Sequence, residues 1–185
     1  MRTSRALILA SIAASGLLLA GCKPTASTVN TNAANTGTST TAAAAAKPAG
    51  LGATINVTDE SGDKLAVTLV KVDLHPAATD GFSTPPTGDV YYAAQVQIKN
   101  VGSAAWSDSP SNCMIVKDAK GQTFQPDLVQ SISSGPLMAA TANLAPGDSA
   151  LGWIVFDVAK GDTVTQVQFT PLSGMGDDTA QWSVS

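Results

Sequence analysis

The chain has 185 residues and carries 10 basic against 14 acidic side chains, a formal net charge of −4. From Leu51 onward it has six lysines, no arginine and fourteen carboxylates, a net charge of −8. Nucleic acids and anionic lipid headgroups both favour basic surfaces, so this composition argues against a nucleic-acid partner and against direct electrostatic attachment to a membrane.

The first 22 residues have the layout of a bacterial lipoprotein signal. Arg2 and Arg5 give a basic start, and Ala6 to Ala20 form an apolar run too short for a comfortable membrane span. The segment ends in Leu19-Ala20-Gly21-Cys22, which resembles a lipobox. The resemblance implies cleavage after residue 21 and a diacylglycerol on the Cys22 thiol. The alternative is an ordinary secretory signal in which Cys22 is incidental.

Residues 22–50 are rich in Thr, Ser, Ala and Asn and contain no aromatic residue. Such a segment cannot bury enough apolar surface to offset the entropy of ordering, so we expect a disordered tether. The tether and its lipid would hold residues 51–185, one domain, at the outer face of a bacterial cell membrane. If Cys22 is lipidated, Cys113 has no disulfide partner. Because Cys113 opens an apolar run, we expect a buried side chain rather than a reactive thiol.

The folded region reads as short strands separated by turn signals and long loops. In the strand from Lys64 to Leu74, the apolar positions shift phase between Leu69 and Val70, which predicts a β-bulge. No segment has a sustained helical period. We therefore predict an all-β, two-sheet antiparallel sandwich of seven or eight strands. The expected strands are residues 54–58, 64–74, 90–100, 113–117, 122–124, 149–158, 164–170 and 181–184.

Two sequence motifs resemble a known family. Leu144-Ala145-Pro146-Gly147-Asp148 precedes the apolar strand Gly152 to Val158, and the strand from Tyr91 ends in Lys99-Asn100-Val101-Gly102. Together they resemble the bacterial secreted or lipoprotein immunoglobulin-like domains of unknown function, a group similar to the mycobacterial immunoprotective extracellular antigen. The resemblance implies an immunoglobulin-like fold and a lipoprotein or membrane-anchored protein. It implies no catalytic residues.

The sequence gives little support for a catalytic function. Gly147-Asp148-Ser149 is similar to the start of a lipase-esterase motif, but the only histidine, His75, lies upstream in a loop. We read Asp148 as a turn residue and His75 as a solvated one, and we expect no enzyme activity.

Metal and cofactor sites are not expected either. One His and one free Cys cannot build a zinc or copper site. The segments Asp59 to Asp63 and Asp177-Asp178 are candidates for calcium, but neither matches the full EF-hand loop, and we predict turns.

The aromatic residues that bear on binding are Tyr91, Tyr92, Trp106, Trp153 and Trp182. Trp153 and Trp182 lie in strands and are expected in the core. Tyr91, on a polar strand face, and Trp106, in a loop, are the candidate exposed binding aromatics. We expect a lipid-anchored, surface-displayed, non-catalytic module that binds a protein or cell-envelope component through the loops His75 to Asp89 and Gln125 to Asn143. The alternatives are a small-ligand or carbohydrate carrier with a cavity between the sheets, and an envelope hydrolase.

Overall fold

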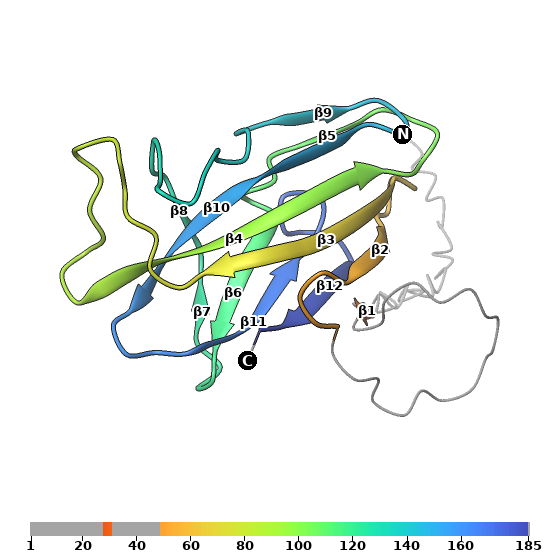
Figure 1. Ribbon diagram of the computed structural model, residues 1–185. Helices are drawn as coiled ribbons and strands as arrows, with labels where there is room; N and C mark the ends of the chain where they lie inside the picture. Colours follow the sequence, from red (N-terminus) through yellow and green to blue (C-terminus); the bar gives the residue numbers. More distant parts are fainter. Residues whose placement is uncertain (1–27, 31–48, 185) are drawn as a thin grey trace, which may run out of the picture.

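The computed structural model describes residues 28–30 and 49–184, and these residues build two five-stranded sheets that pack face to face (Figure 1). The first sheet has the order β2-β3-β4-β10-β8, and the second has the order β1-β12-β11-β6-β7. The described residues also form a short two-stranded sheet, β5-β9. The strands of the first sheet are β2 (Thr54–Thr58), β3 (Lys64–Asp73), β4 (Asp89–Asn100), β10 (Ser149–Ala159) and β8 (Pro126–Asp127).

The second sheet contains β1 (Thr28–Asn30), β12 (Asp178–Ser183), β11 (Val164–Phe169), β6 (Met114–Asp118) and β7 (Thr123–Phe124). The short sheet pairs β5 (Trp106–Asp108) with β9 (Ala142–Leu144). The predicted all-β, immunoglobulin-like sandwich is confirmed. The described residues form twelve strands rather than seven or eight, because the segments expected as tether and loops contain the short strands β1, β5, β8 and β9. The described residues contain no helix, and hence none long and apolar enough to cross a membrane.

The start of the fold differs in detail from the expected boundary at residue 51. Within the segment expected to be a disordered tether, β1 pairs in parallel with β12. Ala49 is buried, and its carbonyl accepts a hydrogen bond from the Ser183 amide (2.8 Å). The indole of Trp182 donates to the Ala53 carbonyl (2.8 Å). The last strand thus fastens the chain around residues 49–53 to the sandwich. Cys22 and the signal segment lie outside the described residues.

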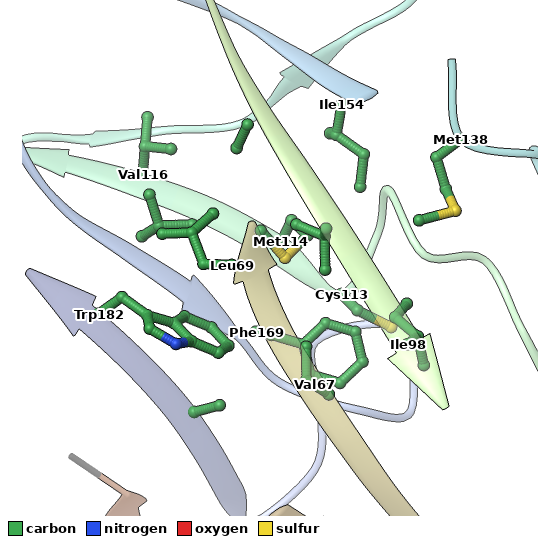
Figure 2. Packing of buried hydrophobic residues seen from close by; sticks show 14 of the residues in the cluster. Val67, Leu69, Ile98, Cys113, Met114, Val116, Met138, Ile154, Phe169 and Trp182 are labelled. Carbon is green, nitrogen blue, oxygen red and sulfur yellow. The ribbon is translucent and has the colours of Figure 1, made fainter. Parts of the chain in front are cut away.

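Alternating apolar side chains from both sheets fill the space between them. Val67, Leu69 and Ile98 of the first sheet face Phe169 and Trp182 of the second (Figure 2). Cys113 lies in the same core, as predicted, and its thiol donates to Asp108 Oδ2 (3.2 Å). Burial, together with this carboxylate, raises the pKa of the Cys113 thiol, so the reactive thiolate is disfavoured.

The predicted bulge in β3 is confirmed, because the register with β4 shifts between Leu69 and Lys71. Before the shift, Leu65, Val67 and Leu69 point into the core. After the shift, the ammonium group of Lys71 lies 5.3 Å from the ring centre of Trp153. The extra residue therefore turns Lys71 to the outer face of the first sheet, while Val72 packs against the main core.

Candidate functional site

At one end, the first sheet is buried on both faces. Tyr91, Ala93, Trp153 and Val155 form an apolar cluster, separate from the main core, into which Ile132 also packs. Strands covered on both sides carry consecutive apolar residues instead of an alternation. The cover in this case comes from the two long loops that follow β3 and β8.

These two loops bond to each other along their length. The Thr79 amide donates to the Ser131 carbonyl (3.0 Å), and the Ser133 amide donates to the Ala77 carbonyl (2.8 Å). Between these bonds, Ala78 and Ile132 form an antiparallel bridge. Residues 77–83 and 128–133 therefore act as one structural unit, which we call the loop platform.

The carboxylate of Asp80 joins the two halves of the loop platform. It accepts hydrogen bonds from the side chain and backbone of Ser83 and from the backbone amides of Phe82 and Gln130, the last at 3.0 Å. Led by the Ser83 hydroxyl, these donors hold the pKa of Asp80 well below its usual range. A negative charge is therefore fixed at the junction of the loops.

The loop platform exposes two large apolar side chains. Phe82 is 71% exposed and Leu128 is 90% exposed, although both are of a kind that folding normally buries. Phe82 lies two residues after Asp80, and Leu128 lies two residues before Gln130, whose amide donates to Asp80. Their backbone is thus held in place while their side chains stay in water, as expected of residues used for binding.

Carboxylates surround this surface. Burial, with the nearby Asp127 and Asp89, raises the pKa of Asp157 to about 6. The pKa of Tyr91 is also raised, mainly by burial. The charges of Asp127 and Asp157 and a hydrogen bond with Asp127 add to this shift. The loop platform therefore combines exposed apolar groups with negative charge.

The prediction that Tyr91 and Trp106 are exposed is wrong. Tyr91 is 5% exposed because the loop platform covers it, and Trp106 is 2% exposed because β5 pairs with β9 over the main core. The prediction that Trp153 and Trp182 are buried is confirmed. Phe82 and Leu128 were missed, because single apolar residues in loops carry no periodicity. For Phe82 the available signal was its isolation among polar, Gly and Pro residues, whereas Leu128 is followed by Val129 and had no such signal.

The lipase-like motif forms a turn. The Asp148 amide donates to the Ala145 carbonyl (3.0 Å), and Gly147 adopts a positive φ of 90° that suits a glycine at this turn position. Ser149 pairs with Lys99 at one end of β4. Asp73, which lies two residues before His75, pairs with Ala93, six residues along β4 from Lys99. Six strand residues correspond to about 20 Å, so Ser149 and His75 are not within bonding reach.

The two calcium candidates lie next to each other. The Asp177 amide donates to Glu60 Oε1 (2.7 Å), and the Thr58 amide donates to Asp178 Oδ2 (3.2 Å). The turn predicted for Asp59 to Asp63 is confirmed by the Gly62 amide, which donates to the Asp59 carbonyl (2.9 Å). Across the described ranges, no group of three His, Cys, Asp or Glu residues is placed to hold a metal ion.

The fold and the loop platform define an immunoglobulin-like β-sandwich that presents two exposed apolar residues, Phe82 and Leu128, on joined loops. Residues 50–179 match the family described as a domain of unknown function (DUF4352). The chain belongs to this family, and the resemblance seen in its motifs is confirmed. A comparison with curated protein sequences found no match.

Solved structures with the same fold come from several bacteria. The secreted protein MPT63 of Mycobacterium tuberculosis is 21% identical with a TM-score of 0.51, over 72% of this chain and 94% of that one. The yjhA protein of Bacillus subtilis is 14% identical with a TM-score of 0.52, over 74% and 99%. A Bacillus subtilis protein provisionally classed as a lipoprotein, ycdA, is 16% identical with a TM-score of 0.51, over 71% of this chain and 38% of that one.

Proposed function

We propose that this protein is a lipid-anchored, non-catalytic display module that captures a protein partner through its loop platform. The observation that carries the proposal is the exposure of Phe82 and Leu128 on two loops bonded to each other through Asp80. Exposed apolar side chains on a rigid scaffold lose little entropy on binding, and they are typical anchors of protein interfaces.

The charge of the surface indicates the chemistry of the partner. Asp80 adjoins Phe82, and Asp127 adjoins Leu128. A complementary surface would offer an apolar recess with lysine or arginine at its rim. An anionic surface, such as acidic lipid or nucleic acid, would be repelled.

Placement outside the cytoplasm is supported by the lipobox-like segment ending at Cys22. MPT63, which shares the fold, is described as a secreted protein, and ycdA is provisionally classed as a lipoprotein. The non-catalytic character is supported by the separation of Ser149 from His75. The tether would let the loop platform reach a partner at some distance from the membrane.

Site-specific photocrosslinking on intact cells tests this function. The full chain is expressed with a photoreactive phenylalanine analogue at position 128, and in a second strain at position 175. Met175 is a matched control, because it is also exposed and apolar but lies outside the loop platform. We expect a discrete protein adduct from position 128 and none from position 175.

A variant that alters the charge and the shape of the binding surface completes the test. The double variant Phe82→Ser and Asp127→Lys, combined with the crosslinker at 128, should remove the adduct without lowering the amount of protein on the cell. The proposal fails if both positions give the same adducts, or if the double variant keeps the adduct of the parent chain.

A further inference from the structure

The outer face of the first sheet has two halves of different character. The loop platform covers one half. In the other half β2, β3, β4 and β10 lie side by side (Figure 1), and their outward side chains are exposed or half-buried. We call this half the bare face. It consists of the outward residues of the segments Thr54–Thr58, Lys64–Lys71, Gln95–Lys99 and Ser149–Leu151.

The bare face is basic in a domain that is acidic as a whole. Lys64, Lys71 and Lys99 point outward from it and are exposed, and none of the outward residues that the structure describes in these four segments is Asp or Glu. These are three of the six lysines of a domain with a net charge of −8. The carboxylates closest to it in sequence, Asp63 and Asp148, lie in the turns at one end.

The covered half carries the opposite charge. Asp80 is held ionised in the loop platform by its hydrogen bonds, and Asp127 and Asp157 lie close together beside it. Phe82 and Leu128 are exposed in the same half. One face of the molecule therefore has a raised, acidic half with apolar side chains and a flat, basic half.

The bare face also offers an apolar contact. Leu151 is 55% exposed, and it lies two residues along β10 from Ser149, which pairs with Lys99. An apolar side chain close to lysines is the chemistry expected of a surface that receives Phe82 and Leu128 together with the acidic residues beside them.

We infer that a second copy of this chain binds to the outer face of the first sheet, with its loop platform on the bare face of the first copy. Both halves belong to one face, so a copy turned end over end about a two-fold axis makes the same contact twice. The inference rests on the proposed function, because it names the partner of the loop platform.

The size of the bare face is sufficient for such a dimer. Four strands and about six residues along them give roughly 19 Å by 20 Å, or about 400 Å². Each copy contributes its bare face and the loop platform that covers the other copy. About 800 Å² are therefore buried per copy, which is the area of an ordinary stable interface.

Substitutions that reverse one charge test the dimer. Sedimentation velocity over a series of concentrations measures the dimer dissociation constant of the full chain carrying Cys22→Ala, so that neither lipid nor detergent takes part. We expect the parent chain to dimerise. Asp127→Lys or Lys99→Asp should raise the constant roughly tenfold or more, because the two-fold axis repeats each unfavourable contact. Lys117→Asp is the matched control, because Lys117 lies on the second sheet, and it should have no effect.

Mixing the two variants gives the decisive measurement. In a dimer of one Asp127→Lys chain and one Lys99→Asp chain, one contact keeps both original charges and the other has both charges reversed. The mixture should therefore recover most of the affinity that each variant loses alone. Recovery requires that both chains are folded, so misfolding cannot imitate it.

The inference is overturned if the parent chain stays monomeric at every concentration, or if the mixture recovers no affinity. A monomeric chain that gives an adduct with a different protein from position 128 would reject the dimer and keep the proposed capture function. Dimers that follow the charge reversals, with no adduct from position 128 on cells, would keep the dimer and reject the capture function.

Discussion

Gly152 lies beneath the segment that crosses the edge of β10. The Met138 amide donates to the Trp153 carbonyl (2.8 Å), and the Trp153 amide donates to the Pro136 carbonyl (3.1 Å). A Cβ atom on Gly152 would lie only 2.4 Å from the Met138 Cα atom. The absence of a side chain at this position thus allows the backbone around Met138 to approach and bond to β10.

Gly152→Ala should therefore destabilise the domain. Since the obstacle is backbone, we expect a loss of roughly 1–3 kcal/mol in unfolding free energy, measured by urea denaturation. Gly50→Ala is the matched control, because its Cβ would meet nothing within 4 Å, and its change should stay within about 0.5 kcal/mol. Equal effects of the two variants would show that the crossing segment can move aside.

Tyr92→Phe should not destabilise the protein. Removing a buried hydroxyl without a partner should leave the unfolding free energy unchanged or raise it by about 1 kcal/mol. Denaturant titration of the Cys22→Ala chain measures the change. A loss of more than about 1 kcal/mol would mean that the hydroxyl has a stabilising partner within the protein.

Asp157 makes stability depend on pH. Its folded-state pKa of about 6 lies above the usual 3.8, so the folded state binds its proton more tightly than the unfolded state does. Its contribution is fully present below about pH 4 and is lost as the pH rises through about 6. Because the group keeps access to water, we expect roughly 1 kcal/mol after allowance for solvent screening.

The measurement compares urea unfolding of the parent chain and of Asp157→Asn between pH 4 and 7. Asparagine cannot ionise, so the difference in unfolding free energy between the two proteins should grow with pH in favour of the variant. The exposed Asp148→Asn serves as a control for a general change in net charge. A difference that stays constant over this range would contradict the argument.

At the scale of elements, the loop platform depends on bonds between two segments some fifty residues apart. Asp80→Ala removes the acceptor that bonds both Ser83 and Gln130. We expect the amides of Gln130, Thr79 and Ser133 to lose protection in hydrogen exchange, while the unfolding midpoint of the domain stays nearly unchanged.

Thr84→Ala is the control for this experiment, because Thr84 is an exposed residue of the same loop. It should leave the exchange rates as they are. If Asp80→Ala also leaves them unchanged, the backbone bonds between Thr79 and Ser131 hold the loops without the carboxylate.

The strands themselves follow from local patterns. Ala94, Val96 and Ile98 alternate with Gln95, Gln97 and Lys99, and the structure places them in the core with Tyr92, as predicted. The apolar phase shift after Leu69 likewise predicted the bulge. Alternation depends only on neighbouring residues, so it can be read without knowing the fold.

Burial on both faces was harder to recognise. The runs Tyr91 to Ala94 and Trp153 to Phe156 are continuously apolar, which indicates strands covered on both sides. The prediction of a polar face for Tyr91 rested on Gln95 and Gln97, which follow it on the same side of the strand. That prediction did not take the apolar run into account. Only the end of the sheet is covered, so the face changes from apolar to polar along one strand.

At the scale of the whole molecule, the acidic domain would need the lipid to stay at a membrane. With a net charge of −8 from Leu51 onward, it would be repelled by anionic headgroups. Cys22→Ala should therefore move the protein from the membrane fraction into the medium or the wall extract, since two acyl chains supply the attachment.

Fractionation followed by immunoblotting measures this distribution. Cys113→Ser is the matched control, because it removes the other cysteine of the chain and keeps a hydrogen-bond donor for Asp108. It should stay with the membrane. A Cys22→Ala protein that remains in the membrane fraction would overturn the lipid attachment.

The sequence by itself determined the strand pattern, the bulge, the turn at Asp148, the buried Cys113 and the family. Each of these depends on residues close together in the chain. The tertiary structure decided which aromatic residues are covered and how the two loops join. These features depend on contacts between distant segments, such as Ala78 with Ile132. Local sequence periodicity cannot predict such contacts, because they form only when the two sheets and their loops pack together.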